Sequence, residues 1–340
     1  MFKILGHRTS IISFILLIIQ MVATMSCGDP EGAQIIVNEN ATNPYIREVG
    51  DTDISAHRSG ADIAPQNTLM AFEKVLKNNK KYKVDIYEFD IQITKDGQLV
   101  LLHNDTYDAT SNAKEAFGKR NISPKDYTFE ELQVLNLGEN FCDKDGNYPY
   151  RGLRGDDIPK NLRVVTLDSI LDYIEKNSRG QFSYIIEIKS DGKWCTKACD
   201  RLYEVLKERD LLDRAITASF HPIFAYYKDK NYPDMQRSAN IGEVLKFYTY
   251  CRGNWDLTDA DIKYVALHIP YGDSISVGEN MIVNIGTKQV INYAHKYDIA
   301  VQYWTINSVD DAVELIENGA DAIMSDDPSV ITDAFKKAFK

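Results

Sequence analysis

The feature that most constrains the fold is an alternation of short β-rich segments with helical patterns from residue 51 to residue 340. Alternating β and α units of this kind predict one parallel (β/α)8 barrel, a TIM barrel, with a doubly wound open sheet as the alternative. The candidate strands are residues 54–57, 84–93, 184–188, 215–220, 235–239, 264–269, 300–306 and 322–325.

Helix boundary signals support this division of the chain. Over residues 308–318, Ser308 can cap the N-terminus, Asp311 fits a capping box, and Gly319 can end the helix in the left-handed conformation. The segment therefore predicts a helix between the last two strands.

One further apolar run, residues 99–103, follows the second candidate strand too closely to join a parallel sheet. The intervening Asp96-Gly97 pair favours a tight hairpin, whereas a parallel crossover needs about a dozen residues. We therefore expect an antiparallel return that opens an insertion at about residues 95–162. Long loops at the C-terminal rim of a barrel commonly form substrate pockets.

The hairpin also predicts where His103 lies. If Asp96 and Gly97 form a two-residue loop, Lys95 pairs with Gln98, and His103 falls directly opposite Asp90. Directly opposed side chains share a face of the sheet, so the imidazole is expected beside the carboxylates of the preceding strand.

The N-terminal 26 residues have the pattern of an export signal. Lys3 and Arg8 precede an apolar run at residues 11–23, which is shorter than the roughly 20 residues that span a bilayer. Thr24-Met25-Ser26-Cys27 resembles a bacterial lipobox, although Thr24 stands where Leu is usual. We expect Cys27 to be lipidated and to hold the exported protein on a membrane, with ordinary cleavage nearby as the alternative.

Residues 27–50 are polar and lack sustained periodicity, which predicts a tether before a catalytic body at residues 51–340. Removing residues 1–26 takes away two positive charges and no negative ones, so the formal net charge changes from −11 to −13. Such a surface repels nucleic acid and anionic membranes. An anionic substrate would therefore need a local cationic site, either a metal ion or well-placed Arg and Lys.

The cysteines beyond Cys27 do not have the spacing of a zinc cluster. Cys195 and Cys199 are separated by one helical turn, with no second Cys or His pair at a suitable distance. Buried apolar thiols or one disulfide bond are the two interpretations for these residues together with Cys142 and Cys251.

Ionisable side chains stand near the C-terminal ends of the first strands. Glu88 and Asp90 have period-two spacing, as do Glu187 and Lys189 on the next strand. Because three buried carboxylates repel one another, a hard divalent cation, Mg²⁺ or Ca²⁺, would stabilise Glu88, Asp90 and Glu187. The alternative is a buried ion-pair network with Arg58 and Lys189.

Taken in order, these residues resemble the signature of bacterial glycerophosphodiester phosphodiesterases over about residues 54–330. The matching motifs are His57-Arg58, Pro65-Gln66-Asn67-Thr68, Glu88-x-Asp90, Lys95-Asp96-Gly97, His103, Glu187-x-Lys189, Ser219-Phe220, Trp304-Thr305-Ile306-Asn307 and Ala320-Asp321-Ala322-Ile323-Met324-Ser325-Asp326.

The resemblance implies a role for each matched residue. It implies that Glu88, Asp90 and Glu187 bind the metal, that His57 and His103 are the acid/base pair, and that Arg58 and Lys189 hold the phosphate. It also makes Asn307 a pocket residue. The sequence departs from the family at Ser59, Gln66, Asn104 and Ala109, which affects groups around the site more than the implied ligands and proton carriers.

Other residues near strand ends have plainer interpretations. Trp304, Phe220 and Trp194 could line the pocket, although an aromatic at a strand end is more often part of the core. The remaining histidines, His221, His268 and His295, are interpreted as structural or surface residues.

The implied reaction is metal-dependent cleavage of a glycerophosphodiester to glycerol phosphate and an alcohol. Histidine suits proton transfer near neutral pH. Two alternatives remain, namely a phospholipase-type enzyme that acts on intact lipid through an exposed apolar rim, and a surface binding protein that has lost turnover through Gln66 and Asn104.

Overall fold

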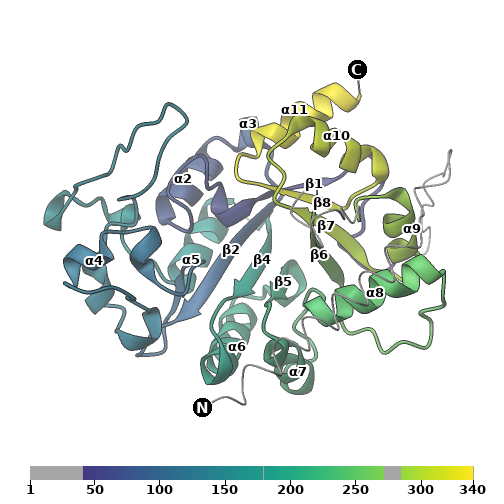
Figure 1. Cartoon of the computed structure of the whole chain (residues 1–340), viewed down its shortest axis with the longest axis horizontal. Coiled ribbons are helices and arrows are strands. Elements are labelled where there is room, and N and C mark those ends of the chain that lie inside the picture. The colour runs from purple at the N-terminus through teal and green to yellow at the C-terminus, as the bar shows by residue number, and fades with distance from the viewer. Residues whose placement is uncertain (1–40, 179, 272–284, 340) are drawn as a thin grey trace, which may run out of the picture.

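The computed structural model describes residues 41–178, 180–271 and 285–339. It has a ring of parallel strands surrounded by helices, with residues of the insertion forming a separate lobe on one side (Figure 1). The predicted TIM barrel is confirmed, and the open-sheet alternative is wrong. Within the described ranges no helix has the length and hydrophobicity needed to cross a bilayer.

The strands follow one another around the barrel in chain order. Hydrogen bonds join them in the order β5-β4-β2-β1-β8-β7-β6, and β3 pairs with β2 outside the barrel. The strand bounds are β1 Asp53–Ala56, β2 Ile86–Ile93, β3 Leu99–Leu101, β4 Ser183–Ile188, β5 Ala215–Ala218, β6 Ala266–Pro270, β7 Ala300–Trp304 and β8 Ala322–Ser325.

The expected strand at residues 235–239 is reduced to two isolated parallel bridges. Arg237 pairs with Thr217 of β5, and Ser238 pairs with Ala266 of β6. These bridges close the barrel between β5 and β6. Arg237 is 1% exposed and forms ion pairs with Asp229 and Glu243, each at 2.7 Å.

Helices cover the outside of the barrel and the insertion. The α-helices are α2 Leu69–Lys77, α3 Asn79–Tyr82, α4 Ala113–Ala116, α5 Leu167–Ser178, α6 Gly192–Glu208, α7 Pro222–Asn231, α8 Ile241–Gly253, α9 Lys288–Lys296, α10 Val309–Asn318 and α11 Ser329–Ala338. The 3-10 helices are η1 His57–Ser59, η2 Tyr107–Ala109, η3 Pro124–Asp126, η4 Glu131–Val134, η5 Gly155–Asp157, η6 Lys160–Leu162 and η7 Leu212–Arg214.

The predicted helix before the last strand is confirmed as α10. The Ser308 side chain accepts a hydrogen bond from the Asp311 N–H, and Gly319 ends the helix with a φ of +89°. Only Gly adopts this conformation without a steric penalty from Cβ.

The hairpin between β2 and β3 forms, but its register differs by one residue from the prediction. The Thr94 N–H donates to the Gln98 carbonyl, so the loop has three residues, with Gly97 at a φ of +85°. A left-handed Gly is typical of the third position in such a loop. The predicted pairing of Lys95 with Gln98 is therefore wrong.

The expected tether is wrong for residues 41–50, which pack against the barrel. Tyr45 is 4% exposed and clusters with Ile86 and Ile185 at the starts of β2 and β4. The Asn43 side chain donates to the Val265 carbonyl at 2.7 Å. A buried aromatic side chain at this end of the barrel removes apolar surface from water, so the ordered body begins before Asp51. The signal peptide, the lipobox and the remainder of the tether lie outside the described residues.

Candidate active site

The barrel interior changes from apolar to charged along each strand. On β2, Ile86, Glu88 and Asp90 alternate onto one face because side chains in a strand repeat with period two. On β4, Ile185 and Glu187 do the same, and the register pairs Asp90 with Glu187. Apolar residues thus fill the interior at the strand starts, and carboxylates surround the C-terminal mouth.

Three carboxylates converge at that mouth. Glu88, Asp90 and Glu187 each offer an oxygen, and these oxygens lie within 4.8 Å of one another. Glu88 is 4% exposed and Asp90 is 1% exposed. The convergence predicted from period-two spacing is confirmed as geometry, and the donors are the hard oxygen ligands that Mg²⁺ and Ca²⁺ prefer.

Burial and mutual repulsion perturb these carboxylates. Burial, with a further contribution from Asp90, raises the pKa of Glu88 to about 7. Burial also raises the pKa of Glu187, against the opposing effect of Lys189. For Asp90, burial is the largest effect and acts upward, but Lys189, His103 and Arg58 together with the hydrogen bond from Asn67 outweigh it, and the pKa is lowered. Such perturbation is common at functional sites.

Lys189 and Arg58 form ion pairs with the same cluster. The Lys189 ammonium lies 2.7 Å from Glu187 and 3.2 Å from Asp90, and Arg58 Nε lies 3.9 Å from Asp90. The buried ion-pair network that the sequence analysis gave as the alternative to a metal ion is therefore present between these cations and Asp90 and Glu187. It does not extend to Glu88, which accepts the Arg58 backbone N–H at 2.6 Å and has His57 Nε2 at 4.0 Å.

The chain adopts left-handed conformations where it brings these groups together. Arg58 has a φ of +47° and Asn67 a φ of +55°. The Asn67 side-chain amide donates to the Asp90 carboxylate at 2.9 Å and accepts the Asp90 backbone N–H at 3.1 Å. One Arg58 guanidinium nitrogen donates to Gln66 at 2.8 Å, so the residue that departs from the family pattern orients the arginine.

His57 is oriented by an acidic residue, Asp326, which the sequence analysis included in the closing motif without assigning it a role. Its Nδ1 lies 2.7 Å from Asp326 Oδ1, and Asp326 Oδ2 accepts from the Asn307 amide at 2.8 Å. Burial alone would lower the pKa of His57, but the hydrogen bond with Asp326 and the charge of Glu88 raise it. Asn307 thus supports Asp326 and is absent from the lining of the cavity. The position of Asp326 directly after the last strand was the available signal.

His103 reaches the site by a different route from the one predicted. Leu102, not His103, is opposite Asp90, because the Leu102 N–H donates to the Asp90 carbonyl at 3.0 Å. The strand ends at Leu101, so the chain beyond it is free to turn, and His103 lines the same cavity as Glu88 and Asp90. Its Nε2 lies 2.9 Å from an Arg58 guanidinium nitrogen. Since guanidinium can only donate, Nε2 accepts and Nδ1 carries the proton.

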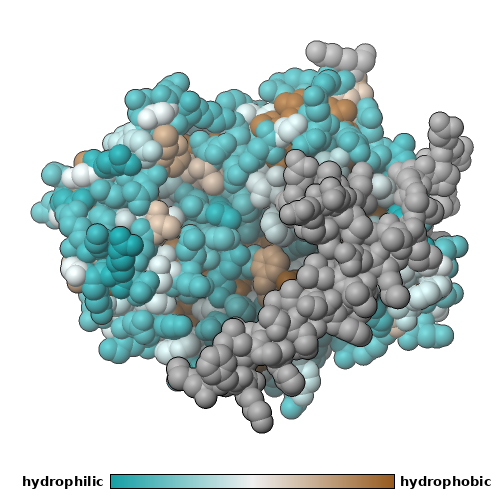
Figure 2. Space-filling model, in the orientation of Figure 1, coloured by the Kyte–Doolittle hydropathy of each residue, from teal (hydrophilic) through white to brown (hydrophobic). Residues whose placement is uncertain are grey.

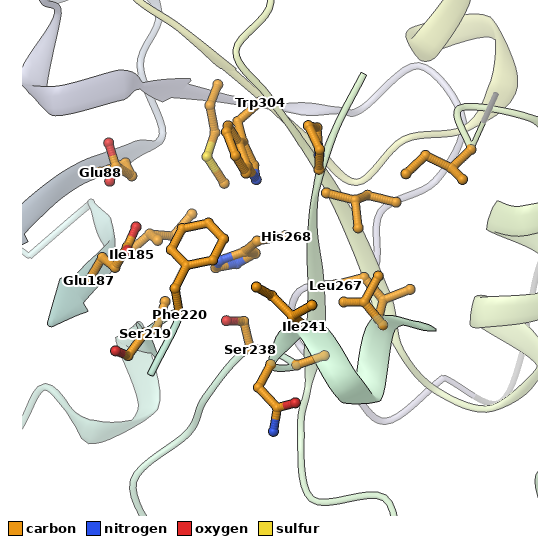
Figure 3. Close-up of a pocket in the computed structure, with 18 of the residues that line it drawn as sticks. Glu88, Ile185, Glu187, Ser219, Phe220, Ser238, Ile241, Leu267, His268 and Trp304 are labelled. Atoms are coloured by element: carbon orange, nitrogen blue, oxygen red, sulfur yellow. The ribbon is translucent and has the colours of Figure 1, made fainter. Parts of the chain in front are cut away.

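The mouth opens into a cavity of about 410 Å³. The catalytic candidates occupy one end, and Phe220 and Trp304 meet edge to face at 6.1 Å between their ring centroids. In Figure 3 the Glu88 and Glu187 carboxylates lie on one side of these rings, with Ile241 and Leu267 on the other.

The cavity lining corrects two expectations. The insertion contributes no lining residue beyond His103, because its apolar side chains instead pack into a cluster of their own around Tyr107, Leu132 and Leu135. His268, interpreted as structural, lines the cavity. Burial lowers its pKa to about 4, with a smaller opposite effect of Gln302.

The other singled-out residues have structural surroundings. His221 contacts the Lys189 carbonyl at 3.1 Å, and His295 contacts Asp321 at 2.9 Å, as the structural interpretation expected. Trp194 packs against the core and does not line the cavity. Cys195 and Cys199 are buried thiols, and burial raises the pKa of each.

Comparisons with known proteins agree with this geometry. A family described as the glycerophosphoryl diester phosphodiesterase family matches residues 57–330. A glycerophosphodiester phosphodiesterase of Caldanaerobacter subterraneus subsp. tengcongensis is 26% identical over 286 residues, which cover 84% of this chain and 98% of that relative.

Solved structures share the fold. A glycerophosphodiester phosphodiesterase from Agrobacterium tumefaciens superimposes with a TM-score of 0.58 at 16% identity, covering 82% of this chain and 99% of that one. An Oleispira antarctica phosphodiesterase, solved in complex with the product sn-glycerol-3-phosphate, gives a TM-score of 0.59 at 20% identity over 84% of this chain and 96% of that one. With the family match covering most of its length, this chain belongs to the glycerophosphoryl diester phosphodiesterase family and is a phosphodiesterase of that family.

Proposed function

We propose that this chain hydrolyses glycerophosphodiesters to glycerol phosphate and an alcohol, with a divalent metal and two histidines. The observation that carries the proposal is the convergence of Glu88, Asp90 and Glu187 within 4.8 Å in a cavity that His57 and His103 also line. The complex of the Oleispira antarctica relative with sn-glycerol-3-phosphate supports the choice of substrate.

The carboxylate cluster fits a metal ion. Three oxygens from adjacent strands suit Mg²⁺ or Ca²⁺, and each of the three carboxylates is buried or nearly so. When bound, such an ion polarises a phosphoryl oxygen and stabilises the negative charge of the transition state.

Arg58 and Lys189 are the cations that bind the phosphate. Both line the cavity beside the carboxylates, and both carry their charge at neutral pH. Arg58 is oriented from two sides, because one guanidinium nitrogen donates to Gln66 and another to His103. We assign its remaining N–H groups to phosphate oxygens, a match that guanidinium geometry favours. Trp304 forms a wall of the substrate site above the Phe220 ring.

The two histidines divide the proton transfers. One takes the proton of the attacking nucleophile, and the other protonates the leaving alkoxide. Asp326 fixes the orientation of the His57 ring through Nδ1 and leaves Nε2 facing the carboxylate side. In His103 the proton sits on Nδ1, which is buried without a hydrogen-bond partner among the described residues.

The two departures from the family pattern at Gln66 and Asn104 do not support the alternative of a surface binding protein that has lost turnover. Gln66 hydrogen-bonds to Arg58, and Asn104 acts through its backbone carbonyl, which accepts from the Gln92 side chain. Neither change removes a group from the carboxylate cluster or a histidine.

We also propose that the protein is exported and held on a membrane through Cys27. The support is the sequence alone, namely the charged and apolar pattern of residues 1–26 and the lipobox-like residues before Cys27.

The test of the proposed function is hydrolysis of glycerophosphocholine, followed by release of glycerol phosphate and choline. We expect turnover that a chelator abolishes and that Mg²⁺ or Ca²⁺ restores. Turnover that persists after exhaustive chelation would contradict the metal dependence, and absence of turnover with every added divalent ion would contradict the substrate class.

A further inference from the structure

The second histidine of the proposed pair, His103, lies just beyond the strand pairing that leads to it. Strand β3 ends at Leu101, and the Leu102 N–H still donates to the Asp90 carbonyl at 3.0 Å. No strand pairing continues through His103 itself. The position of this histidine relative to the carboxylates therefore depends on contacts outside the strand ladder.

The His103 ring has one hydrogen bond to hold it. Its Nε2 accepts from an Arg58 guanidinium nitrogen at 2.9 Å, and its Nδ1 is buried without a hydrogen-bond partner among the described residues. The proposed function assigns Arg58 to the phosphate, so this long side chain is not a fixed support once substrate binds. The support has to come from the backbone that carries the ring.

Gln92 supplies that support. It lies on β2, two residues beyond Asp90, and so on the same face of the strand as Glu88 and Asp90. Its side-chain NH₂ donates to the backbone carbonyl of Asn104, the residue directly after His103. The strand that carries two of the three carboxylates thus also holds the turn that carries the histidine.

The contact depends on the length and the chemistry of glutamine. Gln92 is 5% exposed, and its backbone pairs with Val100 in the hairpin, so the side chain extends from a fixed point. Met has nearly the same length but no N–H group to donate, and Asn is shorter by one CH₂. Neither replacement can therefore make the hydrogen bond to the Asn104 carbonyl.

Loss of this hydrogen bond should change the fold little. Asn104 is partly exposed, and the lobe that the insertion forms has a largely hydrophilic surface in Figure 2, so water can replace the amide at the carbonyl. Strand β2 keeps its backbone pairing with β3 and β4. Proton transfer tolerates much less, because a misplacement of about 1 Å can lower a rate roughly 10²-fold.

We propose that Gln92 is a positioning residue, which fixes His103 relative to Glu88 and Asp90. It acts through the Asn104 carbonyl and is absent from the cavity lining. Because the contact uses only the backbone of Asn104, the departure from the family pattern at that residue leaves it intact. The inference rests on the proposed function, in which His103 transfers a proton.

The experiment compares Gln92→Met with the parent in turnover of glycerophosphocholine, in metal binding and in Tm. We expect kcat to fall by roughly 10- to 100-fold. KM and the dissociation constant of the metal should stay within about twofold of the parent, because the lost interaction serves the chemical step alone. An unchanged kcat, or metal binding that weakens as much as kcat falls, overturns the inference.

A double-mutant cycle with His103→Ala identifies the histidine as the group through which Gln92 acts. In the His103→Ala background, Gln92→Met should lower kcat no further, because the group that it positions is gone. A full further loss in that background contradicts the assignment. Gln92→Asn keeps the amide but is too short to reach the carbonyl, so it should give the same pattern and serves if Gln92→Met does not fold.

The matched control is Gln133→Met. The Gln133 side chain donates to the Val164 backbone carbonyl at 3.0 Å, within the insertion and away from the cavity lining. The control variant therefore loses the same kind of hydrogen bond and should keep the kcat of the parent. A comparable fall of kcat in Gln133→Met contradicts a role that is specific to Gln92.

A last arm does not depend on turnover. Diethyl pyrocarbonate modifies neutral histidine rings, and mass spectrometry gives the rate at each ring. In Gln92→Met the rate at His103 should rise several-fold, because the released ring is more often exposed to water, whereas the rate at His221 should stay that of the parent. An unaltered rate at His103 overturns the inference. Absence of turnover in the parent would refute the proposed function, and the modification rates would still decide the inference.

Discussion

Replacing Asp326 by Asn should disable His57 through the proton arrangement of its ring. Asn307 Oδ1 accepts from both the Asp326 backbone N–H and the Ser325 hydroxyl, each at 3.0 Å, so the Asn307 NH₂ group must face Asp326 Oδ2. An amide at residue 326 then has to turn its oxygen to Asn307 and its NH₂ to His57 Nδ1. The ring nitrogen becomes an acceptor, and the proton moves to Nε2.

The magnitude follows from the cost of each alternative. If the new amide flips so that its oxygen accepts from His57 Nδ1, its NH₂ group faces the NH₂ group of Asn307. The hydrogen bond between residues 326 and 307 is then lost, at a cost of about 1–3 kcal/mol. If it does not flip, the ring has the wrong tautomer, which costs about 10⁴-fold in turnover in a histidine held in this way by an aspartate. Because the less costly alternative sets the loss, we expect kcat for glycerophosphocholine to fall by roughly 5- to 160-fold, since 1.36 kcal/mol corresponds to tenfold.

The assay pairs kcat with two measurements that a structural defect would change. The dissociation constant of the metal, from calorimetry, and the melting temperature should stay near those of the parent, because Asp326 is not among the clustered carboxylates. The control is Asp327→Asn, whose carboxylate contacts Lys144 and Ser329 and does not contact His57. Unchanged kcat in Asp326→Asn, or an equal loss in Asp327→Asn, would refute the role of the His57–Asp326 contact.

Three other predictions concern stability, proton transfer and processing. Arg237→Met leaves Asp229 and Glu243 without their buried partner and should lower the free energy of unfolding by about 3 kcal/mol, which is roughly 6–12 °C in Tm. The control, Arg154→Met at a more exposed ion pair, should lower it by under about 1 kcal/mol. Equal Tm shifts in the two variants would contradict the prediction. His103→Ala should lower kcat far more than it weakens metal binding, and equal loss of both would make His103 a ligand. Mass spectrometry should find a lipidated Cys27 at the mature N-terminus, and an unmodified terminus elsewhere would remove the anchor.

Local patterns predicted the barrel and the carboxylate cluster because both depend on strand periodicity. Glu88, Asp90 and Glu187 occupy alternate positions on adjacent strands, so convergence follows once the strands are placed. The role that sequence reasoning missed depends on a contact between distant segments. Asp326 orients a histidine 269 positions earlier, and no local spacing links the two.

Loop geometry limited the prediction in two other places. Both two-residue and three-residue hairpins accept an Asp-Gly pair, and the three-residue form moved the register so that Leu102 stands opposite Asp90. Tyr45 packs onto the barrel although its neighbours are polar, because one buried aromatic side chain produces no periodic pattern.

Calorimetric titration of the purified chain with Mg²⁺ and with Ca²⁺ tests the central claim most directly. The carboxylate geometry predicts one bound ion per chain, lost or greatly weakened in Glu187→Gln and retained in His103→Ala and in Asp326→Asn. The ion that binds should also restore glycerophosphocholine turnover after chelation. At each metal concentration, the fraction of chains that have bound metal should equal the fraction of activity that is restored. Binding that is unaltered in Glu187→Gln, or full turnover with the site empty, would contradict the assignment of Glu88, Asp90 and Glu187 as the metal ligands.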